Sequence, residues 1–126
     1  MKEELINCLE TLNYPVYLQG SLASPADYPD SFFAFWDFQN NESAFYDNGA
    51  NRCVWGFWVY FYSTSPQNVH DIPEQARQLL RQNGFIVEGK PSDVRVDAPT
   101  HTGAMFTCYG VENYAESTTE GGNANA

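Results

Sequence analysis

The residues best suited to catalysis or metal binding are few in this chain of 126 residues and lie far apart. The two histidines, His70 and His101, are separated by 31 positions. The cysteines are Cys8, Cys53 and Cys108, and none lies at zinc-ligand spacing from a histidine. We therefore expect no metal site and no bound cofactor. His70 is predicted in a loop before a helix, and His101 in a turn where it bonds nearby backbone.

Cysteine chemistry would need Cys53 or Cys108 to act as a nucleophile with a histidine as its base. Each cysteine lies instead in an apolar segment, where a thiol behaves as a small buried hydrophobic group. Their odd number and wide spacing also favour reduced thiols over a disulfide framework. Core packing is the expected role, and the chain is not expected to be an enzyme.

Paired carboxylates, Asp93 with Asp97 and Asp27 with Asp30, are the remaining acid–base candidates. They lie in a strongly acidic chain, in which 16 acidic residues outnumber 6 basic ones, so we interpret them as solvated charge. A formal net charge of -10 argues against binding nucleic acid by phosphate neutralisation. No apolar run approaches the length of a membrane span, so no membrane partner is expected.

The elements that would position such residues are dominated by a long aromatic segment, residues 53–62 (CVWGFWVYFY). Its aromatic and β-branched content predicts a strand. Alternation places Cys53, Trp55, Phe57, Val59 and Phe61 on one side and Val54, Trp58, Tyr60 and Tyr62 on the other. Both sides are apolar, so both need covering, by helices of the same chain or by another copy.

The other segments complete an α+β pattern. We predict helices over residues 3–12 and from Asp71 to Gly84, the second with Pro73 in its first turn. Strands are predicted near residues 16–18, 32–38, 85–87, 94–96 and 105–111, and the segments 32–38 and 53–62 are expected to pair. The predicted fold is a small antiparallel or mixed sheet with two helices packed on it. We expect one domain, residues 1–116, followed by a disordered tail, residues 117–126.

Between the two aromatic strands, residues 39–52 are mostly polar and contain the turn signal Asp47-Asn48-Gly49. We predict an extended hairpin or flap here. Phe45 and Tyr46 lie at its middle and are predicted to contact a neighbouring subunit or another protein. Trp55, Trp58, Tyr60 and Tyr62 are the further interface candidates, although packing within the core and under the helices would also account for them.

Four strings are similar to one protein family: residues 45–48 (FYDN), 60–63 (YFYS), 79–90 (LLRQNGFIVEGK) and 97–103 (DAPTHTG). With the order of elements, they resemble tail-terminator or tail-completion proteins, the head–tail joining structural proteins of long-tailed phages and prophages. The resemblance covers roughly residues 14–113. It would place an arginine after Gly103, where this chain has Ala104 and Met105.

The resemblance implies a virion protein of the tail or neck, assembled in the host cytoplasm. It implies a homo-oligomeric ring, expected to be hexameric, that terminates the tail tube and joins it to the head connector. The tail tube protein and the head–tail connector protein would be its partners. DNA would pass through without specific binding, because a ring lined by carboxylates gains nothing from counterion release.

Other interpretations stay open at this point. The chain could be another phage neck component, or a monomeric protein-binding module with no virion role. An enzyme that uses a cysteine and a histidine is the third alternative.

Overall fold

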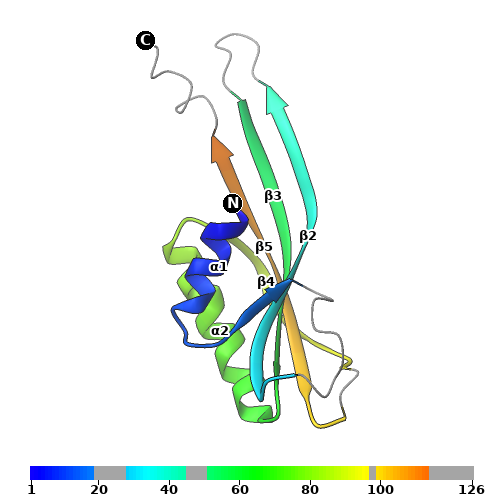
Figure 1. Ribbon diagram of the computed structural model, residues 1–126. Helices are drawn as coiled ribbons and strands as arrows, with labels where there is room; N and C mark the ends of the chain where they lie inside the picture. Colours follow the sequence, from blue (N-terminus) through cyan, green and yellow to red (C-terminus); the bar gives the residue numbers. More distant parts are fainter. Residues whose placement is uncertain (19–27, 45–50, 97–98, 114–126) are drawn as a thin grey trace.

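The computed structural model describes residues 1–18, 28–44, 51–96 and 99–113. In this part of the chain, five strands form one mixed sheet in the order β1-β2-β3-β5-β4, and two helices cover one of its faces (Figure 1). The elements are α1 (Lys2–Glu10), β1 (Val16–Leu18), β2 (Ser31–Ala44), β3 (Asn51–Ser63), α2 (Pro66–Gln82), β4 (Ile86–Val94) and β5 (Thr102–Asn113). The predicted α+β fold is confirmed.

The two aromatic segments pair as predicted and form the centre of the sheet. β2 and β3 are antiparallel, with Phe33 opposite Phe61 and Trp36 opposite Trp58. Their ladder continues through polar residues as far as Ala44 opposite Asn51. The predicted flap is therefore the far end of these two strands, because backbone hydrogen bonding does not require apolar side chains. Phe45, Tyr46 and the predicted turn lie outside the described residues, as does the predicted tail, residues 117–126.

The three long strands β2, β3 and β5 extend beyond the helical layer (Figure 1). β5 pairs with β3 along its whole length, from Ser63 opposite Thr102 to Arg52 opposite Asn113. The short β1 pairs with β2 in parallel, opposite residues 33–35 alone. The sheet is thus five strands wide beside the helices and three strands wide at the end away from them.

Helix α2 begins earlier than predicted. Ser65 is its N-cap and accepts a hydrogen bond from the Asn68 backbone N–H at 3.4 Å, with Pro66 in the first helical position. The expected start at Asp71 is wrong, and His70 lies within the helix instead of in a loop before it. Pro73 is buried inside the helix, where apolar packing outweighs the hydrogen bond that its ring nitrogen cannot donate.

The two strands predicted at residues 85–87 and 94–96 are one edge strand, β4, with a register shift between Glu88 and Ser92. Gly89 has a φ of 66° within this irregular segment. The buried Arg77 of α2 donates from Nη2 to the Gly89 carbonyl oxygen and from Nη1 to both Glu74 carboxylate oxygens, at 2.7 and 2.8 Å. One long-range hydrogen bond thus ties the irregular segment to the helix.

The main core lies between the sheet and the helices. Its central side chains are fully or almost fully buried and come from α1, β2, β3, α2 and β5: Leu5, Leu9, Phe33, Phe57, Val59, Phe61, Leu80, Phe106 and Cys108. Tyr14 contacts Phe61 edge-on, with ring centroids 5.3 Å apart. The side of β3 predicted to carry Phe57, Val59 and Phe61 is therefore the side covered by the helices.

Candidate functional site: the open face of the sheet

The opposite side of the sheet, which we call the open face, is not covered by a helix in the described part of the chain (Figure 1). Strand register and alternation assign to it fifteen residues of β2, β3 and β5, two of them glycines, between Phe32 and Gln39, Val54 and Tyr62, and Gly103 and Val111. None of them is an aspartate, glutamate, lysine, arginine or histidine. The centre of this surface is therefore without fixed charge, in a protein of formal net charge -10.

A bulge and a glycine shape this surface. Alternation along β2 puts Phe38 on the open face with Trp36, and the register shift between Asp37 and Gln39 leaves Phe38 without a partner in β3. Phe38 stacks on Trp58 with ring centroids 4.9 Å apart and planes 18° apart, and it contacts Tyr109 edge-on at 5.9 Å. A Cβ at Gly56 would lie only 2.7 Å from Phe38 Cζ. Gly56 therefore leaves the space in which the Phe38 ring lies.

Among the described residues, four of the five exposed large apolar side chains lie on this face: Trp36 (47%), Trp58 (38%), Ile86 (61%) and Val111 (39%). Trp36 is opposite Trp58 in the ladder, and Ile86 is opposite Tyr109. Together with Phe38 and Tyr109, these four side chains form one continuous surface across β2, β3, β5 and β4, which we call the aromatic patch.

The other half of the open face is closed by the chain itself. Phe32, Ala34 and Tyr62 are buried there in a second, smaller cluster that includes Tyr17, Tyr28, Val94 and Val96. Tyr62 lies against Gly103, where a Cβ would approach the Tyr62 Cδ1 to 2.6 Å. Within the described part of the sheet, the half that contains the aromatic patch is the exposed half.

His101 holds this closed half together. Its Nε2 lies 2.7 Å from the Pro29 carbonyl oxygen, and its ring contacts Tyr28 edge-on at 5.7 Å. Its Nδ1 is 3.0 Å from Thr100 Oγ1. The prediction that His101 bonds nearby backbone is wrong, because its backbone partner is 72 residues away in the sequence.

The predicted interface residues are divided between the two faces. Trp58 and Tyr60 lie on the open face, whereas Tyr62 lies on the same face but is buried in the smaller cluster. Trp55 lies on the helix side and stacks on Phe57, with planes 4° apart. Of the four, the structure thus leaves Trp58 at the exposed surface. Tyr60 is half-buried against the smaller cluster, where it stacks on Tyr62, and Trp55 is on the other face.

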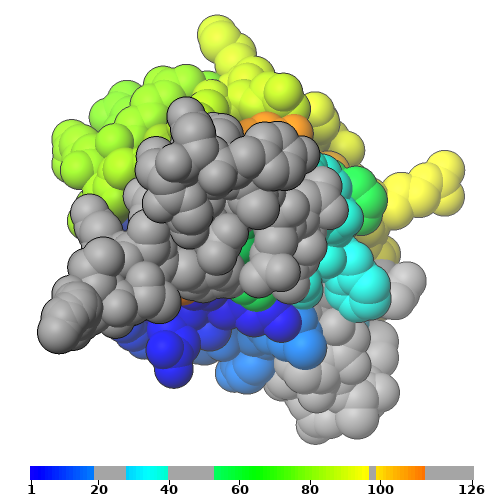
Figure 2. Space-filling model, turned by 90° about the horizontal axis from the view of Figure 1, so that it is seen from above, coloured from blue at the N-terminus to red at the C-terminus, as the bar shows by residue number. Residues whose placement is uncertain are grey.

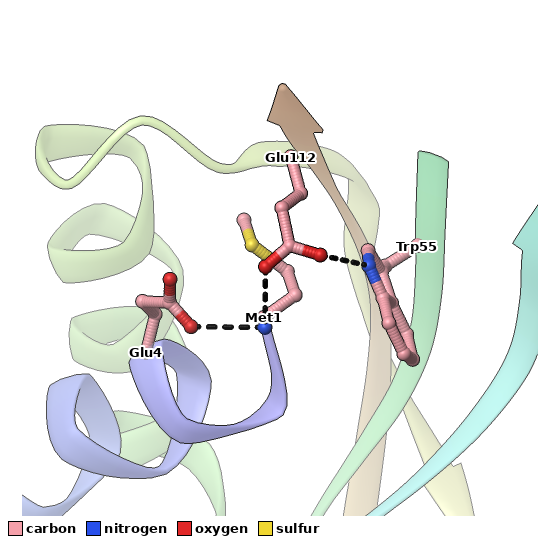
Figure 3. Close-up of polar contacts among 4 residues, drawn as sticks. All are labelled: Met1, Glu4, Trp55 and Glu112. Carbon is pink, nitrogen blue, oxygen red and sulfur yellow. Dashed lines mark hydrogen bonds and ion pairs between the residues drawn. The ribbon is translucent and has the colours of Figure 1, made fainter. Parts of the chain in front are cut away.

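Trp55 belongs to a polar cluster at the top of the helical layer (Figure 3). Its Nε1 donates to Glu112 Oε1 at 3.3 Å, and the other Glu112 oxygen lies 3.2 Å from the amino group of Met1. That amino group also pairs with Glu4 at 3.0 Å. Burial alone would lower the pKa of the Met1 amine, but the hydrogen bonds to Glu4 and Glu112 outweigh it and raise that pKa. The cluster links α1, β3 and β5.

Trp36, Phe38, Tyr109, Ile86 and Val111 are surface residues that the sequence interpretation missed. The signal for Phe38 was Gly56, because a glycine within an aromatic strand indicates the close approach of another group. Ile86 and Val111 lie near strand ends, where alternation is too short to assign a face.

The described residues contain no group of three or more histidine, cysteine, aspartate or glutamate side chains placed to hold a metal ion. Burial raises the pKa of the Cys108 thiol to about 12, with a smaller contribution from Cys8, and burial also raises the pKa of Cys8. Thiols with such pKa values are protonated near neutral pH and are poor nucleophiles. His70 is 84% exposed and lies 2.9 Å from Asp71.

No protein-family model matches this chain, and no curated protein matches it either. No helix in the described ranges has both the length and the apolar character needed to cross a membrane.

Proposed function

We propose that this protein is a virion structural subunit that acts through protein contacts, forming a ring at the tail end or head–tail junction of a long-tailed phage. The ring would terminate the tail tube and join it to the head connector. The aromatic patch is the observation that carries the assembly role. The finer assignment rests on the resemblance of residues 45–48, 60–63, 79–90 and 97–103 to tail-terminator proteins.

The size and chemistry of the aromatic patch support a protein contact. From their exposed fractions, Trp36, Trp58, Ile86 and Val111 leave roughly 400 Å² of mostly apolar surface in water, comparable to the largest apolar patch on a typical monomer, which is often functional. Tryptophan and tyrosine are also the residues most enriched at the centres of protein interfaces. A nucleic acid that stacked on these rings would need a basic groove beside them. The fifteen open-face residues of β2, β3 and β5 include no lysine, arginine or histidine.

The protruding end of β2, β3 and β5 also fits an assembly protein. A three-stranded extension beyond the helical layer offers a long surface to a neighbour. The excess of acidic over basic residues would let DNA pass through a ring without adhering, because carboxylates repel phosphates.

Purified virions of the phage or induced prophage that encodes this chain provide the test. We expect peptides of the protein in the particles, and a ring of copies in averaged density at the head-proximal end of the tail. Deletion of the gene should leave heads and tails that do not join. Absence from the particle, or a single isolated copy in it, would contradict the proposal.

A monomeric protein-binding module is the second candidate, because an aromatic patch would serve a different partner equally well. Such a protein would be absent from virions and would keep the molar mass of one chain at all concentrations. The two measurements together separate the candidates.

A further inference from the structure

The two edges of the sheet differ in charge. Strand order puts β1 at one edge and β4 at the other. Seen from above, α1 and β1 in blue lie on the opposite side of the molecule from β4, which is yellow-green to yellow (Figure 2). The sequence from residue 77 to 95 contains four basic and two acidic residues, whereas the rest of the chain contains two basic and fourteen acidic residues.

The exposed cations around β4, which we call the basic flank, are Arg81, Lys90 and Arg95. No ion pair between described residues involves any of the three. The fourth cation of this region, Arg77, is buried and already paired with Glu74. Glu88 and Asp93 are exposed along the same strand, so the flank has a small excess of positive charge, in contrast to the rest of the protein.

The opposite side, which we call the acidic flank, has exposed carboxylates on α1 and at the start of β2. They are Glu3, Glu10 and Asp30, and none of them takes part in an ion pair between described residues. Lys2, the cation of this flank, lies 3.6 Å from Asp37. The acidic flank therefore keeps unneutralised negative charge.

Each flank also has one exposed aliphatic side chain. Ile86, in the basic flank, is 61% exposed and is the most exposed large apolar residue among those described. Leu18, in the acidic flank, is 47% exposed and is the fifth such residue, the one that does not lie on the open face. Each flank thus combines an apolar anchor with charges of one prevailing sign.

We infer that the basic flank of one copy docks on the acidic flank of a second copy, with Ile86 and Leu18 near the centre of the contact. This inference rests on the proposed function and names the contact that would build its ring. The two surfaces differ, so the contact is heterologous, and repetition closes a ring if the rotation per subunit permits. Charge complementarity orients the approach, and burial of the aliphatic groups supplies affinity.

A second copy fits better than an unrelated protein because one chain provides both halves of the match. Two copies of a protein with net charge -10 repel each other in most orientations. Bringing the basic flank against the acidic flank is the orientation in which the nearest opposing charges attract.

Two variants, each altered on one flank, test the contact in solution by the molar mass of the full chain at rising concentration and low salt. Lys90→Glu with Arg95→Glu reverses the basic flank and leaves the acidic flank intact. Leu18→Lys removes the apolar anchor of the acidic flank, places a charge there that the basic flank repels, and leaves the basic flank intact. We expect the unaltered chain to associate, and each variant alone to associate about tenfold or more weakly.

Mixing the two variants gives the sharper result. The Lys90, Arg95 variant keeps its acidic flank, and the Leu18 variant keeps its basic flank. The two chains should therefore form one-to-one pairs that do not grow further, which is the signature of a heterologous contact. Gln67→Glu with Gln75→Glu is the control, because it adds negative charge at exposed positions of α2 that belong to neither flank. This control should associate as the unaltered chain does. Thermal unfolding of every variant checks that its fold is retained.

Several results would overturn the inference: an unaltered chain that is monomeric at every concentration, a Lys90→Glu, Arg95→Glu variant that associates normally, or a control that loses association equally. Failure here leaves the virion assignment standing if particles still contain a ring, which would then use other surfaces. Absence from particles removes the virion assignment even if the flanks associate in solution.

Discussion

Phe57 and Trp58 are neighbours in β3, yet Phe57 is fully buried under the helices whereas 38% of Trp58 is exposed. Both strand faces are rich in aromatic residues, and the two helices of the described residues cover one of them. On the covered face, aromatic side chains stabilise the fold. On the half of the open face that contains the aromatic patch, similar side chains are left available for another molecule. Aromatic content alone therefore does not distinguish a core from a docking surface.

The largest expected effect is on the covered face. Phe57→Ala leaves a cavity in the main core and should lower the free energy of unfolding by about 3–5 kcal/mol. Denaturant unfolding measures it. Trp58→Ala is the matched change on the open face and should cost clearly less, while weakening association of the chain. Equal losses of stability for the two variants would show that the faces do not differ as described.

Gly56→Ala should have the next largest effect. Its Cβ would meet Phe38 Cζ at 2.7 Å and Gln39 Cβ at 3.0 Å, so the Phe38 ring must move off Trp58. We expect a loss of about 1–3 kcal/mol in denaturant unfolding. In a double-mutant cycle, adding Phe38→Ala should reduce the cost of the Gly56 substitution, since it removes the closest clash and leaves the 3.0 Å approach to Gln39 Cβ. Simple additivity would mean that Phe38 does not lie over Gly56.

A smaller effect is expected for the Met1 cluster. The pKa of the Met1 amine is raised above its ordinary value of 8.0, so its pairing is fully present below pH 8.0 and is lost as pH rises through the folded-state pKa. Glu112→Gln keeps an acceptor for Trp55 and removes the charge. The unaltered chain should exceed this variant in thermal midpoint by roughly one to a few degrees at pH 7, with the gap closing above pH 8. A gap that is constant with pH would exclude the amine as its source.

The smallest expected effect is in cysteine labelling. Cys108 is buried and its pKa is raised to about 12, so iodoacetamide at pH 8 should leave it unmodified in the folded protein and modify it after unfolding. Peptide mass spectrometry distinguishes Cys108 from Cys8 and Cys53. Rapid labelling of Cys108 without unfolding would show that the covered face is open to solvent.

Much of the fold was predictable because its signals are local. The stripe of Leu5, Cys8 and Leu9 predicted α1, and the segment at residues 53–62 predicted β3. The start of α2 was mispredicted because Asp71 with Pro73 resembles a helix start, whereas the equally local pair Ser65 and Pro66 is the cap that the helix uses. The surface was predicted in part: Trp58 and Tyr60 lie on the open face, and Trp55 and Tyr62 do not belong to its exposed half.

Alternation along β3 determined which side chains share a face, because successive residues of a strand point to opposite sides. Composition likewise determined the acidic character of the protein. The three-dimensional arrangement was needed to show which face the helices cover, that Phe38 has no partner in β3, and that Leu18 and Ile86 lie at opposite edges of the sheet. Those features depend on strand order and helix packing, which join residues far apart in the sequence and leave no local pattern.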